Sequence, residues 1–145
     1  MPLESRLLVT DRARTDARDR LDGVADGTLG DPPVASLVAV AAGSAGPLWL
    51  VGGEPTLRAD LPALIRGVAR AHGATLGLAS DGLGIAHRER LAVLREAGLG
   101  RLRIALHALR PDAHDWLVGR DGAWRTAART LELAAEIGLA TEIEA

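Results

Sequence analysis

Short apolar segments alternate with longer amphipathic stretches along the chain, and this alternation limits the fold more than any other feature. Residues Leu48–Val51 are uniformly apolar, as in a strand of a parallel sheet that is buried on both faces. Residues Ala59–His72 instead carry leucine, isoleucine and valine along one stripe of a helix, and Gly73 follows as a helix stop. The pattern predicts an α/β fold built on a parallel sheet.

The expected order is four strand–helix units followed by a fifth strand, with no internal repeat and no low-complexity tract. The expected strands cover Arg6–Thr10, Leu48–Val51, Ala74–Ser80, Arg101–Ala108 and Ala140–Ala145. The expected helices cover Pro32–Ala42, Ala59–His72, Ala86–Ala97 and a last helix that Asp121 caps and that ends at Ile137. Residues 11–31 remain as a connection rich in arginine and aspartate. We expect it to be a solvated, mobile segment, since long loops are usually functional or disordered.

Composition excludes several classes of function. The chain of 145 residues has the length of one domain, and its net charge of -2 gives no electrostatic reason to expect binding to nucleic acid or to an anionic membrane. It has no cysteine, which excludes disulfides, thiolate zinc sites, thiol nucleophiles and a cysteine-ligated iron–sulfur cluster. No secretory signal is visible, and the longest weakly polar stretch, Val34–Val51, is interrupted by glycine and proline. We therefore expect a cytoplasmic protein.

The apolar strand at Leu48–Val51 runs into the sequence Gly52-Gly53-Glu54-Pro55, which has the composition of a ligand-binding turn. Glycines let the backbone approach a ligand closely. The carboxylate of Glu54 can accept hydrogen bonds from an ammonium group, and Pro55 fixes the exit of the chain toward the next helix. The simpler interpretation is a strand-to-helix turn that requires glycine for its backbone conformation.

This turn, between an apolar strand and an amphipathic helix, resembles the motif after the second strand of radical S-adenosylmethionine (SAM) enzymes. Ser80-Asp81-Gly82 is similar to the Thr-Asn-Gly sequence that ends the third strand in that family, although Asp and Gly are also ordinary turn residues. In the expected fourth strand, Ala105 stands where a hydroxyl would help to hold SAM, and His107 stands where an acidic residue is common. A lone histidine at a strand end is more often structural than a ligand or a base.

The resemblance fails at the ligands of the family's iron–sulfur cluster, which are three cysteines spaced C-x3-C-x2-C after the first strand. Aligning the Thr-Asp-Arg run at residues 10–12 with the Thr-Asn-Arg run before the first cysteine places Ala13, Ala17 and Arg20 at the three ligand positions. We therefore expect no iron–sulfur cluster and no radical cleavage of SAM by the family mechanism. The alignment raises the hypothesis that Arg20 replaces the positive charge of the cluster and pairs with a carboxylate.

The resemblance implies a partial (β/α) barrel of the radical SAM type, with SAM bound at the carboxyl ends of the strands. This chain would supply about four βα units and a fifth strand as a single truncated domain, residues 1–145, in which residues 11–31 are the former cluster loop. The expected SAM-type pocket consists of Gly52, Gly53, Glu54, Pro55, Ser80, Asp81 and His107.

Two classes of function remain open at this point. The first is a non-catalytic binding or regulatory domain that associates with a protein partner, with a second copy of itself, or with a peptide substrate of an intact homologue, since an open sheet edge favours association. The second is an enzyme that uses SAM without iron, for instance in polar methyl transfer. A decayed, marginally folded remnant is a third interpretation. Metal-binding patterns around the histidines, phosphate-binding loops and a serine nucleophile motif are absent from the sequence.

Overall fold

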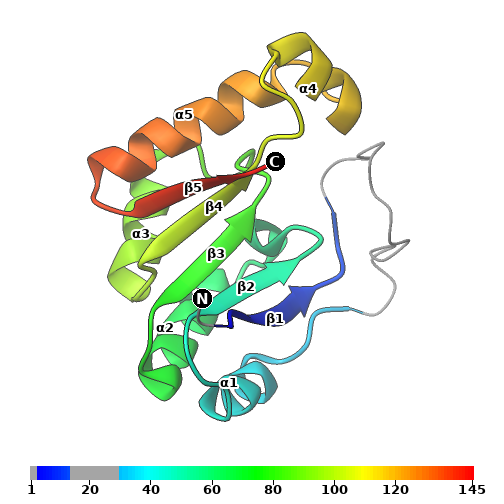
Figure 1. The fold of residues 1–145 in the computed structure, drawn as a ribbon. Helices are drawn as coiled ribbons and strands as arrows, with labels where there is room; N and C mark the ends of the chain where they lie inside the picture. The colour runs from blue at the N-terminus through cyan, green and yellow to red at the C-terminus, as the bar shows by residue number, and fades with distance from the viewer. Residues whose placement is uncertain (1–2, 14–29) are drawn as a thin grey trace.

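The computed structural model describes residues 3–13 and 30–145 (Figure 1). The strands are β1 (Ser5–Thr10), β2 (Leu48–Gly52), β3 (Leu76–Ser80), β4 (Arg101–Ala105) and β5 (Ala140–Glu144). The helices are α1 (Val34–Ala42), the short 3-10 helix η1 (Pro55–Leu57), α2 (Leu61–His72), α3 (Arg88–Ala97), α4 (Pro111–Val118) and α5 (Ala123–Glu136).

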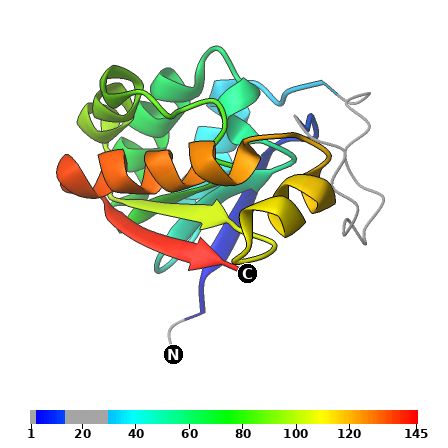
Figure 2. The same cartoon turned by 90° about the horizontal axis from the view of Figure 1, so that it is seen from above.

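The five strands form one sheet in the order β1-β2-β3-β4-β5, and every neighbouring pair is parallel. Helices α1, α2, α3 and α5 lie on the same face of this sheet (Figure 2). Successive parallel strands joined by helices on one face give the curved wall of a partial barrel. The predicted α/β fold with a parallel sheet is therefore confirmed. All carboxyl ends of the strands lie at one edge, where α4 also lies (Figure 1).

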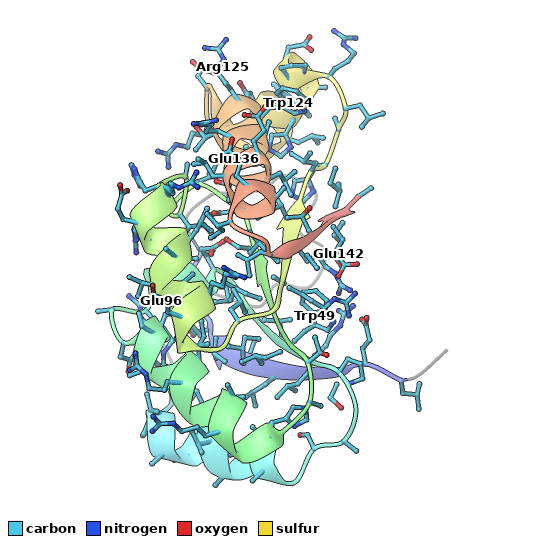
Figure 3. All side chains as sticks on the ribbon, turned by 90° about the vertical axis from the view of Figure 1, so that its left-hand side faces the viewer. Trp49, Glu96, Trp124, Arg125, Glu136 and Glu142 are labelled. Carbon is cyan, nitrogen blue, oxygen red and sulfur yellow. The ribbon has the colours of Figure 1, made fainter. Side chains whose placement is uncertain are left out.

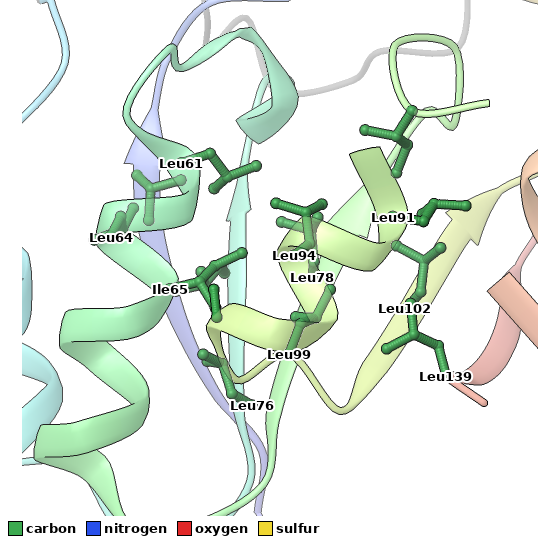
Figure 4. Close-up of a cluster of buried hydrophobic side chains, with 14 of the residues drawn as sticks. Leu61, Leu64, Ile65, Leu76, Leu78, Leu91, Leu94, Leu99, Leu102 and Leu139 are labelled. Carbon is green, nitrogen blue, oxygen red and sulfur yellow. The ribbon is translucent and has the colours of Figure 1, made fainter. Parts of the chain in front are cut away.

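The main core lies between the sheet and its helices. One row across the sheet joins Leu7, Leu50, Leu78 and Leu102 in register, and all four side chains are buried. Leucine and isoleucine side chains of α2 and α3 pack against this row (Figure 4). Each leucine that is fully removed from water contributes about 1.5–3 kcal/mol, so this layer supplies much of the driving force for folding.

The opposite face of the sheet is covered, in the described part of the chain, by charged side chains rather than by helices. Trp49 is only 1% exposed, although the described chain places no helix over it (Figures 2 and 3). The ring lies across Gly77, where a Cβ would collide with it, and the guanidinium carbon of Arg103 lies 3.9 Å from the ring centroid. Glu142 and Glu4 hold Arg103 through ion pairs of 3.1 and 3.2 Å. Charged side chains thus cover the tryptophan on a face that a helix does not cover.

Several local expectations differ from the structure. Strand β4 ends at Ala105 rather than Ala108, and β3 and α3 each begin two residues later than expected, at Leu76 and Arg88. Helix α4 was not expected, because its eight residues carry no apolar stripe long enough to mark a helix. Asp121 is not the cap of α5, which follows Gly122 and has no side-chain cap from that position. Asp115 at the end of α4 serves instead, since its carboxylate accepts hydrogen bonds from the backbone N–H groups of Gly122 (2.7 Å) and Trp124 (2.8 Å).

Apolar side chains remain exposed at both edges of the sheet. Leu8 of β1 is 52% exposed and Ile143 of β5 is 54% exposed. No helix among the described residues has the length and apolarity to cross a membrane.

Candidate functional site at the carboxyl ends of the strands

The Gly52-Gly53 turn is exposed and packs closely against the chain that leaves β1. The N–H of Gly53 donates to the carbonyl of Thr10 (3.1 Å), and the N–H of Glu54 donates to the carbonyl of Arg12 (2.6 Å). A Cβ at Gly52 would collide with the Thr10 carbonyl, and a Cβ at Gly53 would collide with the Arg12 carbonyl. Both glycines are thus required by this close approach of two backbones, a reason that is independent of any ligand.

The side chain of Glu54 points into the protein and is 1% exposed. Its Oε1 accepts hydrogen bonds from the N–H and the hydroxyl of Thr56 (3.1 and 2.7 Å) and from the hydroxyl of Ser80 (2.9 Å). Its Oε2 accepts from the N–H of Asp81 (2.6 Å). Glu54 therefore joins the turn after β2 to the end of β3, two segments that the sequence analysis had placed in the same pocket.

The environment of Glu54 changes its acidity. Burial, and then the negative charge of Asp81, raise the pKa of Glu54 to about 7, although hydrogen bonds from Thr56 and from the Asp81 N–H act in the opposite direction. The side chain is accordingly divided between its neutral and ionised forms near neutral pH. A cationic group that approached Asp81 would favour the ionised form.

The end of β3 supplies the most accessible carboxylate of the site. Asp81 is half-buried, and its Oδ1 accepts a hydrogen bond from the N–H of Leu83 (2.8 Å). Ser80 is buried, and its hydroxyl also accepts from the N–H of Gly82 (3.0 Å), a residue with a φ of +75°. These contacts have the form of an Asp-Gly turn, as the sequence predicted.

His107 follows β4 and contacts His114 of α4. Its backbone N–H donates to Nδ1 of His114 (3.1 Å), and the two rings stack with centroids 5.7 Å apart. His114 is 2% exposed, and Asp115 next to it points toward the start of α5. His114 and Asp115 therefore point apart on this helix and do not form a catalytic pair. The contacts of Glu54 bring Ser80 and Asp81 to the turn after β2, whereas His107 is held through α4.

Two arginines, Arg58 and Arg12, hold this site together through contacts that the sequence does not predict. Arg58 has a side chain only 1% exposed, and its Nη1 donates to the carbonyls of Val9 and Pro32 (both 2.8 Å). Arg12 donates to Asp31 and to the carbonyl of Leu57. The Arg-x-Asp spacing of Arg58 and Asp60 was a weak signal for the first. Arg12 belongs to the Thr-Asp-Arg run at residues 10–12, but nothing in the sequence indicates its contacts with Asp31 and Leu57.

The expected cluster positions can be located only in part. Ala13 lies beside Gly53, at the end of the described segment that leaves β1. Ala17 and Arg20 lie outside the described residues, and so does most of the predicted loop at residues 11–31. None of the three positions holds a thiol, so this donor set does not fit the three thiolates that a 4Fe–4S cluster requires. Within residues 3–13 and 30–145, no group of three or more potential metal ligands converges.

The ends of β2 and β3 present groups that can accept hydrogen bonds from an organic cation. The exposed Gly52-Gly53 backbone lies at the end of one strand, and the half-buried carboxylate of Asp81 lies at the end of the next. Backbone carbonyl oxygens together with a carboxylate can accept the hydrogen bonds of an ammonium group. Ligands of open α/β sheets bind at this edge, where the strands end.

Comparisons with known proteins agree on the fold. The model of the radical SAM superfamily matches residues 34–144. The GTP 3',8-cyclase of Aquifex aeolicus (strain VF5) is 39% identical over 72 residues, which are 49% of this chain and 22% of that protein. The GTP 3',8-cyclase of Synechococcus elongatus (strain ATCC 33912 / PCC 7942 / FACHB-805) is 46% identical over 61 residues, which are 41% of this chain and 18% of that protein. The chain thus spans less than a quarter of the length of these two relatives.

Solved structures of similar shape share little sequence with this chain. Streptococcus suis SuiB bound to the precursor peptide SuiA superposes with a TM-score of 0.70 at 17% identity, covering 98% of this chain and 32% of SuiB. Native anSMEcpe with bound AdoMet and Kp18Cys peptide gives a TM-score of 0.69 at 17% identity, covering 97% of this chain and 43% of that chain. At such identities the similarity establishes the fold alone.

Proposed function

Because this chain belongs to the radical SAM superfamily, we propose that it binds a SAM-type ligand at the carboxyl ends of β2 and β3 and works without the family's iron–sulfur cluster. In this role it is a binding or regulatory domain rather than a radical enzyme. SAM itself would supply an ammonium, a carboxylate and a sulfonium to the site. The residues of the chain would hold and orient the ammonium end.

The observation that carries this proposal is the set of hydrogen bonds around Glu54. The buried carboxylate ties the turn after β2 to Ser80 and Asp81 at the end of β3. These bonds fix the turn after β2 relative to the end of β3, where Asp81 lies. Glu54 itself is shielded from solvent, so we assign direct contact with the ligand to the glycine backbone and Asp81. The glycine backbone and Asp81 are then held in place by Pro55, Ser80 and Glu54. The edge of the site next to β4 is assigned to His107.

The proposal that the protein works without an iron–sulfur cluster is supported by the residues at the three ligand positions. The three aligned positions are Ala13, Ala17 and Arg20, and the chain has no cysteine elsewhere. Without a cluster iron, the amino and carboxyl groups of SAM lose their metal anchor, and only protein groups hold them. We therefore expect affinity for SAM in the micromolar range, near -8 kcal/mol by the usual conversion (~1 μM).

The second part of the proposal is that the domain binds a protein or peptide partner. Both sheet edges carry exposed apolar residues, Leu8 on β1 and Ile143 on β5, and exposed edge strands favour association. The two solved relatives described above are bound to peptides. We propose that this domain associates through its open edge with a protein, with a second copy of itself, or with a peptide that an intact homologue modifies, and that this occurs in the cytoplasm.

Calorimetric titration of the purified chain with SAM, in buffer without iron, tests the proposal. We expect binding in the micromolar range and a loss of ~10-fold or more in Asp81→Asn, which removes the accessible carboxylate and leaves the backbone in place. Asp112→Asn is the matched control, because Asp112 is an exposed carboxylate on α4 whose ion pair is with Arg110. Its affinity should equal that of the unmodified chain.

Three other results would redirect the assignment. Formation of S-adenosylhomocysteine with a methyl acceptor would favour an enzyme that uses SAM for polar methyl transfer. Cooperative unfolding without any SAM binding would leave a scaffold whose partner is a protein. A broad, non-cooperative melt would favour the decayed remnant, a result that the continuous leucine core between the sheet and its helices makes unexpected.

A further inference from the structure

The segment leaving β1 is connected to the residues before α1 by a polar cluster near the Gly52-Gly53 turn. The hydroxyl of Thr10 donates to Oδ1 of Asp31 (2.6 Å), and Nη2 of Arg12 donates to Oδ2 of the same carboxylate (2.5 Å). Nη2 of Arg12 also donates to the carbonyl of Leu57 in η1 (3.1 Å). Asp31 is thus held by two donors from one segment, and Arg12 reaches a third segment.

Arg12 contacts the turn through its backbone as well as its side chain. Its carbonyl oxygen accepts the N–H of Glu54 at 2.6 Å, while its guanidinium contacts the carbonyl of Leu57 beyond the turn. The residues from Glu54 to Leu57 are therefore held at both ends by one residue. Asp31 fixes the orientation of that residue, because it accepts from Nε as well as Nη2 of Arg12 (3.4 and 2.5 Å).

A second arginine joins the same three segments and differs in burial. Arg58 reaches Val9, Pro32 and Asp60, and its side chain is 1% exposed, whereas the side chains of Arg12 and Asp31 are 39% and 24% exposed. A partly exposed ion pair contributes little to stability, whereas breaking the hydrogen bonds of a buried guanidinium to backbone carbonyls costs much more. Arg58 therefore stabilises the fold here, whereas the ion pair of Arg12 can position the nearby backbone without contributing much to stability.

The electrostatics of Asp31 agree with a maintained ion pair. Burial alone would raise the pKa of Asp31, but hydrogen bonds from Thr10 and Arg12 outweigh it and hold the pKa below its usual value. The carboxylate is consequently ionised throughout the neutral range.

We propose that Arg12 and Asp31 are positioning residues for the ligand site, which set the place of the Gly53–Glu54 backbone through the Arg12 carbonyl. The pair fixes where the exposed turn lies relative to Asp81, and it contributes little to global stability. The effect of this pair on ligand affinity rests on the proposed function, whereas its effect on the position of the Gly53–Glu54 backbone is independent of that function.

Amide hydrogen exchange measured by NMR on the full chain tests this inference. In Arg12→Gln and in Asp31→Asn, the Glu54 amide should exchange ~10-fold or more faster than in the unmodified chain, with the urea midpoint of unfolding unchanged. The double variant should exchange no faster than Arg12→Gln alone, because Arg12→Gln already removes the ion pair that Asp31→Asn breaks. Arg88→Gln is the control, since its exposed pair with Glu136 (2.8 Å) lies on α3 and α5.

The expected consequence for binding is a SAM affinity lower by ~5-fold or more in the same two variants, with Arg88→Gln unaffected. Unchanged exchange at Glu54, or effects of the two variants that simply add, would overturn the positioning role. If the unmodified chain does not bind SAM, the proposed function fails and the exchange data alone decide the role of Arg12 and Asp31.

Discussion

Replacing Arg58 by methionine should lower the free energy of unfolding by about 3 kcal/mol or more. The guanidinium is almost fully buried and donates to the carbonyls of Val9 and Pro32. Val9 precedes residues 13–30 in the sequence and Pro32 follows them. Methionine fills similar space and donates no hydrogen bond, so two carbonyl oxygens lose their donor and Asp60 loses its ion pair. An orphaned buried acceptor costs about 1–3 kcal/mol, and here the bond to the Val9 carbonyl is buried and the bond to the Pro32 carbonyl is partly buried.

Urea unfolding of the two proteins measures this difference. Arg88→Met is the matched control, because the Arg88–Glu136 pair has side chains 56% and 50% exposed, and its loss should cost less than about 1 kcal/mol. A change of under 1 kcal/mol in Arg58→Met would mean that water replaces the guanidinium easily, and that Arg58 does not hold the three segments together.

The stability of the protein should fall as the pH rises from 5 to 8, and Glu54→Gln should remove most of that fall. Burial and the charge of Asp81 raise the pKa of Glu54 from an ordinary value of 4.5 to about 7 in the folded protein. Between these values the folded state holds a proton on Glu54 that the unfolded state has released, so stability decreases with rising pH. The contribution is fully present below the unfolded pKa and is lost above the folded one, with an upper limit of about 3 kcal/mol.

The difference between the unmodified chain and Glu54→Gln isolates this group, because the other titrating residues are common to both proteins. Urea midpoints at closely spaced pH values between 5 and 8 give the two slopes. Asp81→Asn should reduce the slope as well, since it removes the second cause of the raised pKa. Parallel curves for the unmodified chain and Glu54→Gln would mean that Glu54 is ionised in the folded protein throughout this range.

The sheet could be predicted because its signals are local and repeated. Leu50, Leu78 and Leu102 lie in apolar segments that can be recognised as strands without knowing which strands they pair with. Gly73 ends α2 with a φ of 72°, a conformation that glycine adopts readily. The cap of α5 could not be predicted in the same way. Asp121 stands in the right place in the sequence, but Asp115 reaches the same N–H groups from a helix without an apolar stripe.

The residues of the candidate site could be named from the sequence, but the direction of their side chains could not. Glu54 was expected to face a ligand, as a carboxylate in an exposed glycine turn would. Its inward orientation depends on Ser80 and Asp81, which approach only when β2 and β3 pair. The contact between Arg12 and Asp31 likewise joins residues separated by 18 others and follows no periodic pattern.

The central claim is that a SAM-type ligand binds at the carboxyl ends of β2 and β3 without iron, and an NMR titration of the labelled chain with SAM tests it most directly. We expect the backbone amide signals of residues 52–54, 56 and 80–83 to shift progressively with SAM concentration, and the signals of α1 and of the middle of α5 to stay unchanged. A folded chain whose amide signals remain unchanged at millimolar SAM, or shift only at positions remote from these two strand ends, would contradict it.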